Sequence, residues 1–147
     1  MEIQKYLNQL LSLRLNQSTI NYYNVLLKDG KEYTKEADRH IVKHYAIINS
    51  AKLKECFKNS LLLALVCDDI DYVEGYYLCE GVPLALEHAW NIKGDEVIDT
   101  TSFKVKGAVL ERFGVKIPKD ALKKYIKTNQ VLTALQFYYL EYHETVC

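Results

Sequence analysis

His88, in the tripeptide His-Ala-Trp, and Asp99, in Asp-Thr-Thr, carry the clearest chemical signal in this chain of 147 residues. A histidine on one strand and an aspartate on the next can act as the base and the orienting carboxylate of a catalytic triad. The third member would be a nucleophile on an element that packs against the same sheet. Cys56, at the start of the apolar stretch CFKNSLLLALVC, is the candidate. The three residues therefore predict a cysteine-nucleophile enzyme.

A predicted β-hairpin would bring the histidine and the aspartate together. Residues 86–92 and 97–101 have the composition of strands, and the Lys-Gly-Asp-Glu segment at 93–96 favours a tight turn between them. If Lys93 pairs with Glu96 across this turn, side-chain alternation puts four residues on one face: His88, Trp90, Asp99 and Thr101. In this register Asp99 is the diagonal neighbour of His88, at about 7–8 Å between Cα atoms, which allows a side-chain hydrogen bond.

The candidate nucleophile lies at the start of a predicted helix over residues 55–67. Apolar residues cover nearly its whole circumference, which is typical of a central, buried helix. Two starts are compatible with the sequence: Ser50 as N-cap puts Cys56 in the second turn, whereas a start near Glu55 puts it in the first. Only in the first turn does the helix dipole favour a thiolate. Otherwise a cysteine in such a helix is most often buried and inert.

The remaining segments are expected to flank this core. Together they predict an α+β fold in which the Cys-bearing central helix packs on a small antiparallel sheet. We expect one domain, with residues 1–50 as an N-terminal helical cover, 51–118 as the core and 119–147 as C-terminal helices. Apolar periodicity and the positions of glycine and proline predict further helices over 2–15, around 107–112, over 119–127 and over 130–144, and a strand over 70–78. Another short helix should run to Leu27, with Ser18 or Thr19 as its N-cap and Gly30 in the left-handed conformation after its end.

Composition restricts the class of partner. Nineteen basic and nineteen acidic residues cancel, without a polybasic or acidic segment, so neither nucleic acid nor an anionic membrane is an expected partner. The longest apolar run, Leu61–Cys67, is too short to span a bilayer, and residues 1–10 do not have the plan of a signal peptide. The four cysteines form no CxxC pair, which favours reduced thiols in the cytoplasm. His40 and His44 share a helical spacing without further ligands, so neither metal nor cofactor is predicted.

Around the candidate triad the sequence resembles the transglutaminase-like branch of the papain-like cysteine enzymes. In that branch a helix-borne cysteine precedes a strand with His-Ala-Trp, and the next strand carries an aspartate. The corresponding residues are Cys56 in ECFKN, His88 in HAW and Asp99 in VIDTT. The similarity spans residues 52–118, and YVEGYYLCEGVPLALEHAW also resembles small uncharacterised bacterial and phage proteins. The departures are a short interval between Cys56 and His88, no proline after Asp99, and Ser50 in place of an oxyanion glutamine.

The resemblance implies a papain-like or transglutaminase-like core and acyl chemistry on a protein, a peptide or a small amide or acyl substrate. His88 would deprotonate Cys56, Asp99 would fix the imidazole tautomer, and Trp90 would shield the pair from water. Attack on a carbonyl would give a thioester that water or an amine resolves. Hydrolase, deamidase and acyl transferase all stay open, as does the oligomeric state.

Supporting residues are also implied. The backbone N–H of Cys56 would donate to the oxyanion, with Asn49 or Asn59 as a second donor. Glu74 in the middle of a strand and Glu87 beside His88 are candidates for contacting substrate. The alternative is a catalytically inactive protein- or peptide-binding module on the same fold, which a buried thiol and a His88 turned away would favour. A structural or assembly protein is the third possibility.

Overall fold

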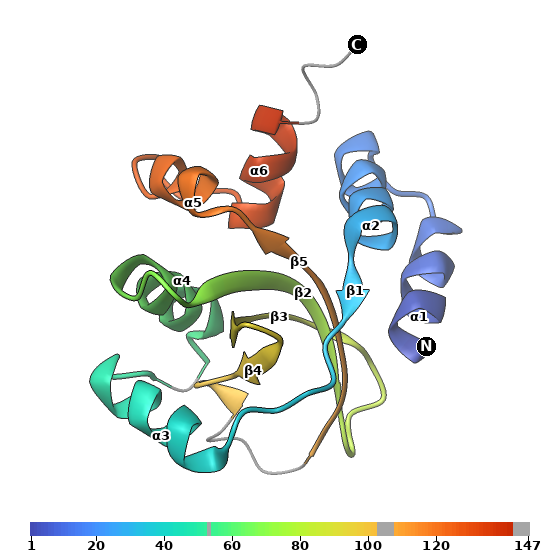
Figure 1. The fold of residues 1–147 in the computed structure, drawn as a ribbon. Coiled ribbons are helices and arrows are strands. Elements are labelled where there is room, and N and C mark those ends of the chain that lie inside the picture. Colours follow the sequence, from blue (N-terminus) through green and yellow to red (C-terminus); the bar gives the residue numbers. More distant parts are fainter. Residues whose placement is uncertain (53, 103–107, 143–147) are drawn as a thin grey trace.

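The chain is seen in a computed structural model, which describes residues 1–52, 54–102 and 108–142 (Figure 1). Helices at both ends of the chain flank four consecutive strands of an antiparallel sheet, which confirms the predicted α+β class. In chain order they are α1 (Glu2–Leu11), α2 (Gln17–Asp29), β1 (Lys31–Glu32), α3 (Arg39–Ile48), α4 (Cys56–Val66), β2 (Asp71–Cys79), β3 (Leu86–Lys93), β4 (Glu96–Ile98), β5 (Val109–Ile117), α5 (Lys119–Tyr125) and α6 (Ala134–Tyr142).

The strands form one antiparallel sheet in the order β1-β5-β2-β3-β4. The long strands β2 and β5 curve, with α1 and α2 on one side and α3 and α4 on the other (Figure 1). The central helix α4 packs on β3 and β2, as predicted. Residues 1–50 therefore contribute the edge strand β1 to the sheet, in addition to helices that cover the core.

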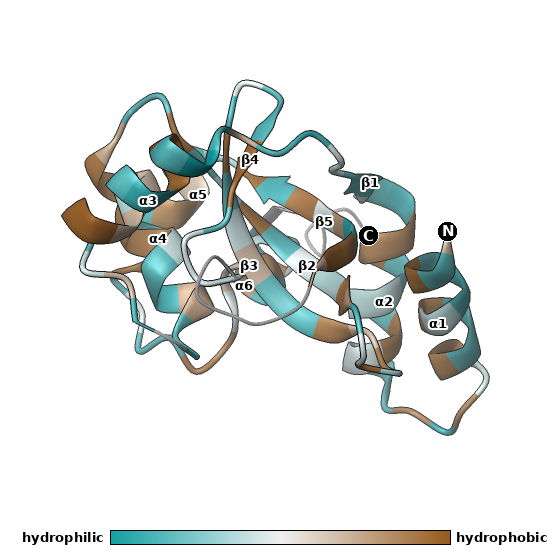
Figure 2. Cartoon of the chain, turned by 90° about the horizontal axis from the view of Figure 1, so that it is seen from below, coloured by the Kyte–Doolittle hydropathy of each residue, from teal (hydrophilic) through white to brown (hydrophobic). Residues whose placement is uncertain are grey.

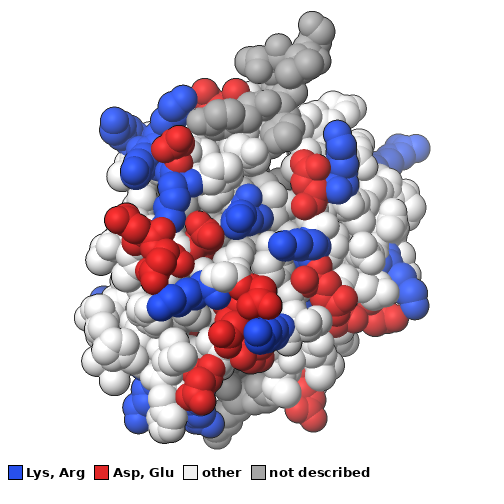
Figure 3. Space-filling view, in the orientation of Figure 1, with Lys and Arg blue, Asp and Glu red and all other residues white. Residues whose placement is uncertain are grey.

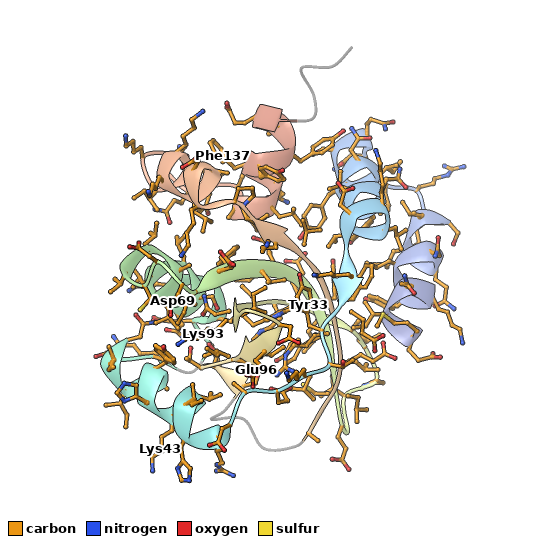
Figure 4. All side chains as sticks on the ribbon, viewed as in Figure 1. Tyr33, Lys43, Asp69, Lys93, Glu96 and Phe137 are labelled. Atoms are coloured by element: carbon orange, nitrogen blue, oxygen red, sulfur yellow. The ribbon has the colours of Figure 1, made fainter. Side chains whose placement is uncertain are left out.

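Apolar residues pack on both faces of the sheet. The larger cluster joins the sheet to α1, α2, α4, α5 and α6, and α1 and α2 alternate between polar and apolar segments in Figure 2. A smaller cluster fills the inside of the curl with Tyr33, Val73, Trp90, Ile92 and Val97. Figure 4 marks Tyr33 there and also Lys93, whose ammonium lies 3.2 Å from the Asp69 carboxylate.

The surface is mixed in charge. Basic and acidic side chains intermingle on the face shown in Figure 3, in line with equal numbers of the two in the sequence. Among the described residues no helix is both long and apolar enough to cross a membrane.

The β3–β4 hairpin has the predicted register. Lys93 pairs with Glu96, and Gly94 has a φ of 62° in the turn, a conformation that glycine adopts readily. The predicted return strand over 97–101 is wrong beyond Ile98, where β4 ends. The Asp99 Oδ1 accepts a 3.0 Å hydrogen bond from the Ser102 N–H, and this local bond favours a turn over a continued strand.

Two details of the N-terminal helices differ from expectation. α2 begins at Gln17, because the Asn16 side chain caps it by accepting from the Thr19 N–H at 2.8 Å, so neither Ser18 nor Thr19 is the cap. Gly30 is extended, with a φ of −71°, rather than left-handed. It is needed for space: a Cβ there would lie 2.3 Å from the Leu26 carbonyl oxygen.

The helix predicted around 107–112 is wrong, since β5 occupies Val109–Ile117 and 103–107 lie outside the described residues. β5 lies between β1 and β2 and is buried on both faces from Arg112 to Val115, so it lacks the alternation that marks a half-exposed strand. The flanking helices are shorter than predicted: α1 ends at Leu11, α5 at Tyr125, and α6 begins at Ala134.

Two glycines face each other on the neighbouring strands β2 and β5. Gly75 pairs with Gly114. A Cβ on Gly75 would lie 2.1 Å from the Phe113 carbonyl oxygen, and one on Gly114 would lie 2.9 Å from Cη2 of Trp90. The missing side chain of Gly75 thus makes room for the backbone of β5, and that of Gly114 makes room for the backbone of β2 and for the indole inside the curl.

Lys119 fixes the C-terminus of α4 to the start of α5. Its ammonium donates to the carbonyl oxygens of Ala64, Cys67 and Ile70, the second at 2.9 Å. We expect Lys119→Met to lower the free energy of unfolding by about 1–2 kcal/mol, because it removes a cation from the negative end of a helix together with its hydrogen bonds.

Urea denaturation of the wild type and of Lys119→Met checks this expectation. Lys123→Met, at an exposed position on the same short helix, is the control and should change stability by less than about 0.5 kcal/mol. Equal stability of the two variants would contradict the assigned role of Lys119.

Candidate active site

His88 and Asp99 meet as the hairpin parity predicts. The Nε2 of His88 lies 2.8 Å from the Oδ2 of Asp99. His88 is 2% and Asp99 3% exposed, so this contact is shielded from water. The predicted hydrogen-bond contact between the two side chains is confirmed.

The Asp99 carboxylate is also held by residues that sequence reasoning missed. Its Oδ2 accepts from the Arg112 guanidinium, with Nε at 3.2 Å and Nη2 at 3.1 Å, and from the Ser102 hydroxyl. Burial alone would raise the pKa of Asp99, but the charge and hydrogen bond of His88 together with the charge of Arg112 outweigh it and hold that pKa well below its usual range. Asp99 is therefore ionised at neutral pH.

His88 is a cation at neutral pH in this setting. Burial alone would lower the pKa of its imidazole. The charge of Asp99 and the hydrogen bond to it act in the opposite direction, as does a hydrogen bond with the Cys56 thiol, and together they raise the pKa of His88 to about 9. Because Nε2 is bonded to Asp99, Nδ1 is the ring nitrogen left for the thiol.

Cys56 is the first residue of α4, with Glu55 at the N-cap, so the second of the two predicted starts is the correct one. The thiol is half-buried. The chain turns sharply just before it, with Lys54 at a φ of 66°. The first turn of a helix offers unpaired N–H groups and the positive end of the dipole, both of which favour an anion.

Asn59 supports this arrangement. Its amide group donates to the Lys52 carbonyl and to the Thr101 hydroxyl, each at 2.8 Å, and accepts from the Lys52 N–H at 3.1 Å. It thus ties α4 to the segment before Cys56 and to the turn that carries Asp99. Both amide hydrogens have partners within the chain, so neither is directed at an oxyanion in this structure. The amide of Asn49 likewise donates to the Asn59 carbonyl, at 2.7 Å.

Aromatic rings cover the imidazole. Tyr77 stacks on His88 with ring centroids 4.0 Å apart and planes at 21°, and Trp90 lies nearly parallel to it at 6.0 Å. Trp90 is fully buried. Sequence reasoning missed Tyr77, although the register holds the signal: Gly75 pairs with His88, so Tyr77 is on the same face two residues along.

Glu74 and Glu87 are not brought to this site. Glu74 lies on the other face of the sheet, fully buried, and accepts from the Tyr72 hydroxyl at 2.8 Å and the Leu135 N–H at 3.1 Å. Glu87 is the next residue before His88 and so points to the opposite face, where its carboxylate accepts from the Tyr76 hydroxyl at 3.3 Å.

Glu36 extends the site to the surface. Its carboxylate accepts from the Nη1 of Arg112, and its side chain is 53% exposed, whereas that of Arg112 is 5% exposed. Charges therefore alternate from solvent inward: Glu36, Arg112, Asp99, His88. A cavity of about 270 Å³ adjoins this row and is lined partly by Glu36, Arg112 and Ser102.

Comparison of this chain with protein-family models, curated proteins and solved structures found no match. Its chemistry is therefore argued from its own geometry. Within the part of the chain that the structure describes, no three His, Cys, Asp or Glu side chains come together as a metal site would require. The groups available for chemistry here are a thiol, an imidazolium and a carboxylate.

The raised pKa of His88 predicts a pH dependence of stability. The folded chain binds the His88 proton more tightly than the unfolded chain, whose histidine titrates near 6.5. This contribution is fully present below pH 6.5 and is lost as the pH rises to about 9. The free energy of unfolding should fall over that window by at most roughly 3 kcal/mol.

Urea denaturation at a series of pH values measures this slope. In His88→Gln, which does not titrate, the decrease between pH 6.5 and 9 should be largely absent. His40→Gln, at an exposed position at the start of α3, should keep it. A slope that persists in His88→Gln would assign the effect to other groups.

Proposed function

We propose that this chain is a cysteine-nucleophile enzyme that acts on an amide or acyl substrate through a thioester, with Cys56, His88 and Asp99 as its triad. One observation supports this function above the others. A partly exposed thiol at the first residue of a helix lies near enough to the His88 imidazole to help raise its pKa, and this imidazole contacts a buried carboxylate at 2.8 Å. A base that lies between a nucleophile and an orienting carboxylate defines a triad irrespective of the fold.

The proposal includes a papain-like core of the transglutaminase-like branch. Its support is the resemblance in residues 52–118 together with a Cys-bearing helix packed on an antiparallel sheet that carries the histidine. The short interval between Cys56 and His88 and the absence of an oxyanion glutamine distinguish this chain from that branch.

The charge state of His88 alters the mechanism expected from the sequence. With a pKa of about 9, His88 carries its proton at neutral pH before substrate arrives. A cation beside a thiol favours the thiolate, so Cys56 and His88 would act as a thiolate–imidazolium pair. In the first step the thiolate attacks the carbonyl carbon, and the backbone N–H of Cys56 donates to the oxyanion.

The second step releases the leaving group. The C–N or C–O bond of the tetrahedral intermediate breaks, His88 gives its proton to the departing amine or alkoxide, and the acyl group stays on sulfur as a thioester. Neutral His88 then takes a proton from water or an amine as it attacks the thioester, which returns the imidazolium and the free thiolate. Asp99 stabilises the imidazolium in the steps in which His88 carries its proton, and Tyr77 and Trp90 hold the ring in place.

An activated ester tests this chemistry. Incubation with p-nitrophenyl acetate should give a burst of p-nitrophenol and one acetyl group per chain, located on Cys56 by peptide mass. Cys56→Ala should lose the burst, and Cys67→Ala, at the other end of the same helix, should keep it. Acetylation of Cys67 at the same rate as Cys56 would remove the nucleophile from this proposal and favour the inactive binding module.

A further inference from the structure

A groove of about 580 Å³ opens between α4, α5 and the segment 126–133, and none of the three triad residues lines it. We call it the α4–α5 groove. Its volume is in the range of pockets that bind small molecules. Several of its apolar side chains face solvent, with Val131 80% and Leu62 41% exposed. Most of the lining is aliphatic or aromatic: Phe57, Leu61, Leu62, Leu65, Val131 and Leu132.

Three of the polar side chains that line the groove are engaged within the chain, and a fourth, Gln130, is exposed. The Tyr72 hydroxyl donates to Glu74 at 2.8 Å, and the Tyr125 hydroxyl donates to the Leu132 carbonyl at 2.6 Å. The Thr133 hydroxyl accepts from the Gln136 N–H at 3.2 Å. A ligand inside the groove would therefore have few protein partners for hydrogen bonds, which favours an aliphatic chain over a polar molecule.

The only charged side chain among the described residues that line the groove is Lys58, which is exposed. An apolar interior with one cation at its mouth matches a ligand with an aliphatic chain and a single negative head. We propose that the α4–α5 groove binds a small anionic amphiphile, with its chain among the leucines of α4 and its carboxylate or similar group near Lys58.

The groove is separate from the proposed active site. Residues of an α-helix succeed one another by about 100°. Lys58, Leu62 and Leu65 therefore leave α4 on the side roughly opposite to Cys56. Occupation of the groove does not require the triad, and Cys56→Ser should bind the amphiphile as tightly as the wild type.

Decanoate below its critical micelle concentration is a suitable probe. Titration followed by calorimetry should show saturable binding of one decanoate per chain. In a nuclear magnetic resonance spectrum of the backbone amides, the largest chemical-shift changes on adding decanoate should fall on residues 57–65 and 126–133. Decyltrimethylammonium, with the same chain and the opposite charge, should bind more weakly than decanoate.

Two variants test separately where the aliphatic chain and the negative head of the ligand bind. Leu65→Trp, which fills the groove, should weaken binding at least tenfold, whereas Val66→Trp, on the same helix at a 74% exposed position outside the groove, should not. Lys58→Gln, a surface change that leaves the core intact, should weaken decanoate roughly two- to fivefold without affecting decanol.

Three results would overturn the proposal. The first is the absence of saturable decanoate binding, and the second is equal affinity for the cationic amphiphile. The third is self-association of the chain that Leu65→Trp abolishes, as measured by light scattering, since the groove would then be an interface between two copies. Cys56→Ser lacks the proposed nucleophile but should still bind decanoate. A failure of the proposed acyl chemistry would therefore leave the outcome of this binding test unchanged.

Discussion

Replacing His88 with alanine should slow the alkylation of Cys56 by iodoacetamide at pH 6 by roughly ten- to a hundredfold, because the imidazolium that favours the thiolate is removed. An ordinary exposed thiol reacts mainly as the pH approaches about 8.5, whereas a thiolate held by a cation is already reactive at pH 6. The measurement is labelling between pH 6 and 9, read for each cysteine by peptide mass.

Cys67 is the internal control for this experiment. It is half-buried like Cys56 but lies at the C-cap of the same helix, where the dipole disfavours an anion. Its rate should not change in His88→Ala. Cys147, the other comparison that the sequence suggests, lies outside the described residues. If native Cys56 reacts no faster than Cys67 at pH 6 to 7, the binding module becomes the better description.

Asp99→Ala should lower the free energy of unfolding by about 3–5 kcal/mol, the largest loss that we expect from any single change at the site. The substitution leaves the buried guanidinium of Arg112 and the buried imidazole of His88 without the carboxylate that both contact. It should also lower the pKa of His88, because the burial of the ring would no longer be offset by a neighbouring negative charge.

Urea denaturation gives the stability change, and a nuclear magnetic resonance titration of the His88 ring gives its pKa. Asp95→Ala is the matched control, since Asp95 is 78% exposed and its ion pair with Lys35 is 3.5 Å long. It should alter stability by less than about 1 kcal/mol. A similar effect of both substitutions would mean that Asp99 is not held by the pairs described above.

The contact between His88 and Asp99 was predictable because it depends on local geometry. A two-residue turn fixes the register of a hairpin, and the register fixes which side chains share a face. The central helix α4 was predictable for a different reason, because apolar residues cover nearly its whole circumference. Alternation also separates Glu74 and Glu87 from the site, once Gly75 is known to pair with His88.

Arg112 and Glu36 were not predictable in this way. Arg112 lies on a strand buried on both faces, where alternation is lost, so the sequence around it predicts a helix instead. Glu36 reaches it across 76 residues of sequence, a separation that no local pattern encodes. The start of α4 was also ambiguous, because the turn before it places Ser50 and Lys54 at positive φ without a glycine to mark it.

The facing pair Gly75 and Gly114 has a consequence for how this sequence can vary. A side chain at either position would strike the opposite strand or the indole of Trp90, and that indole lies beside the His88 ring. At both positions the nearest obstacle is backbone of the opposite strand, the Phe113 carbonyl oxygen at 2.1 Å from a Cβ on Gly75 and the Glu74 carbonyl oxygen at 2.7 Å from one on Gly114. A smaller residue in place of Trp90 would therefore not make room for a larger one at either glycine. In homologues we expect both positions to stay glycine even where the residue at position 90 varies, as long as β2 and β5 pair in this way.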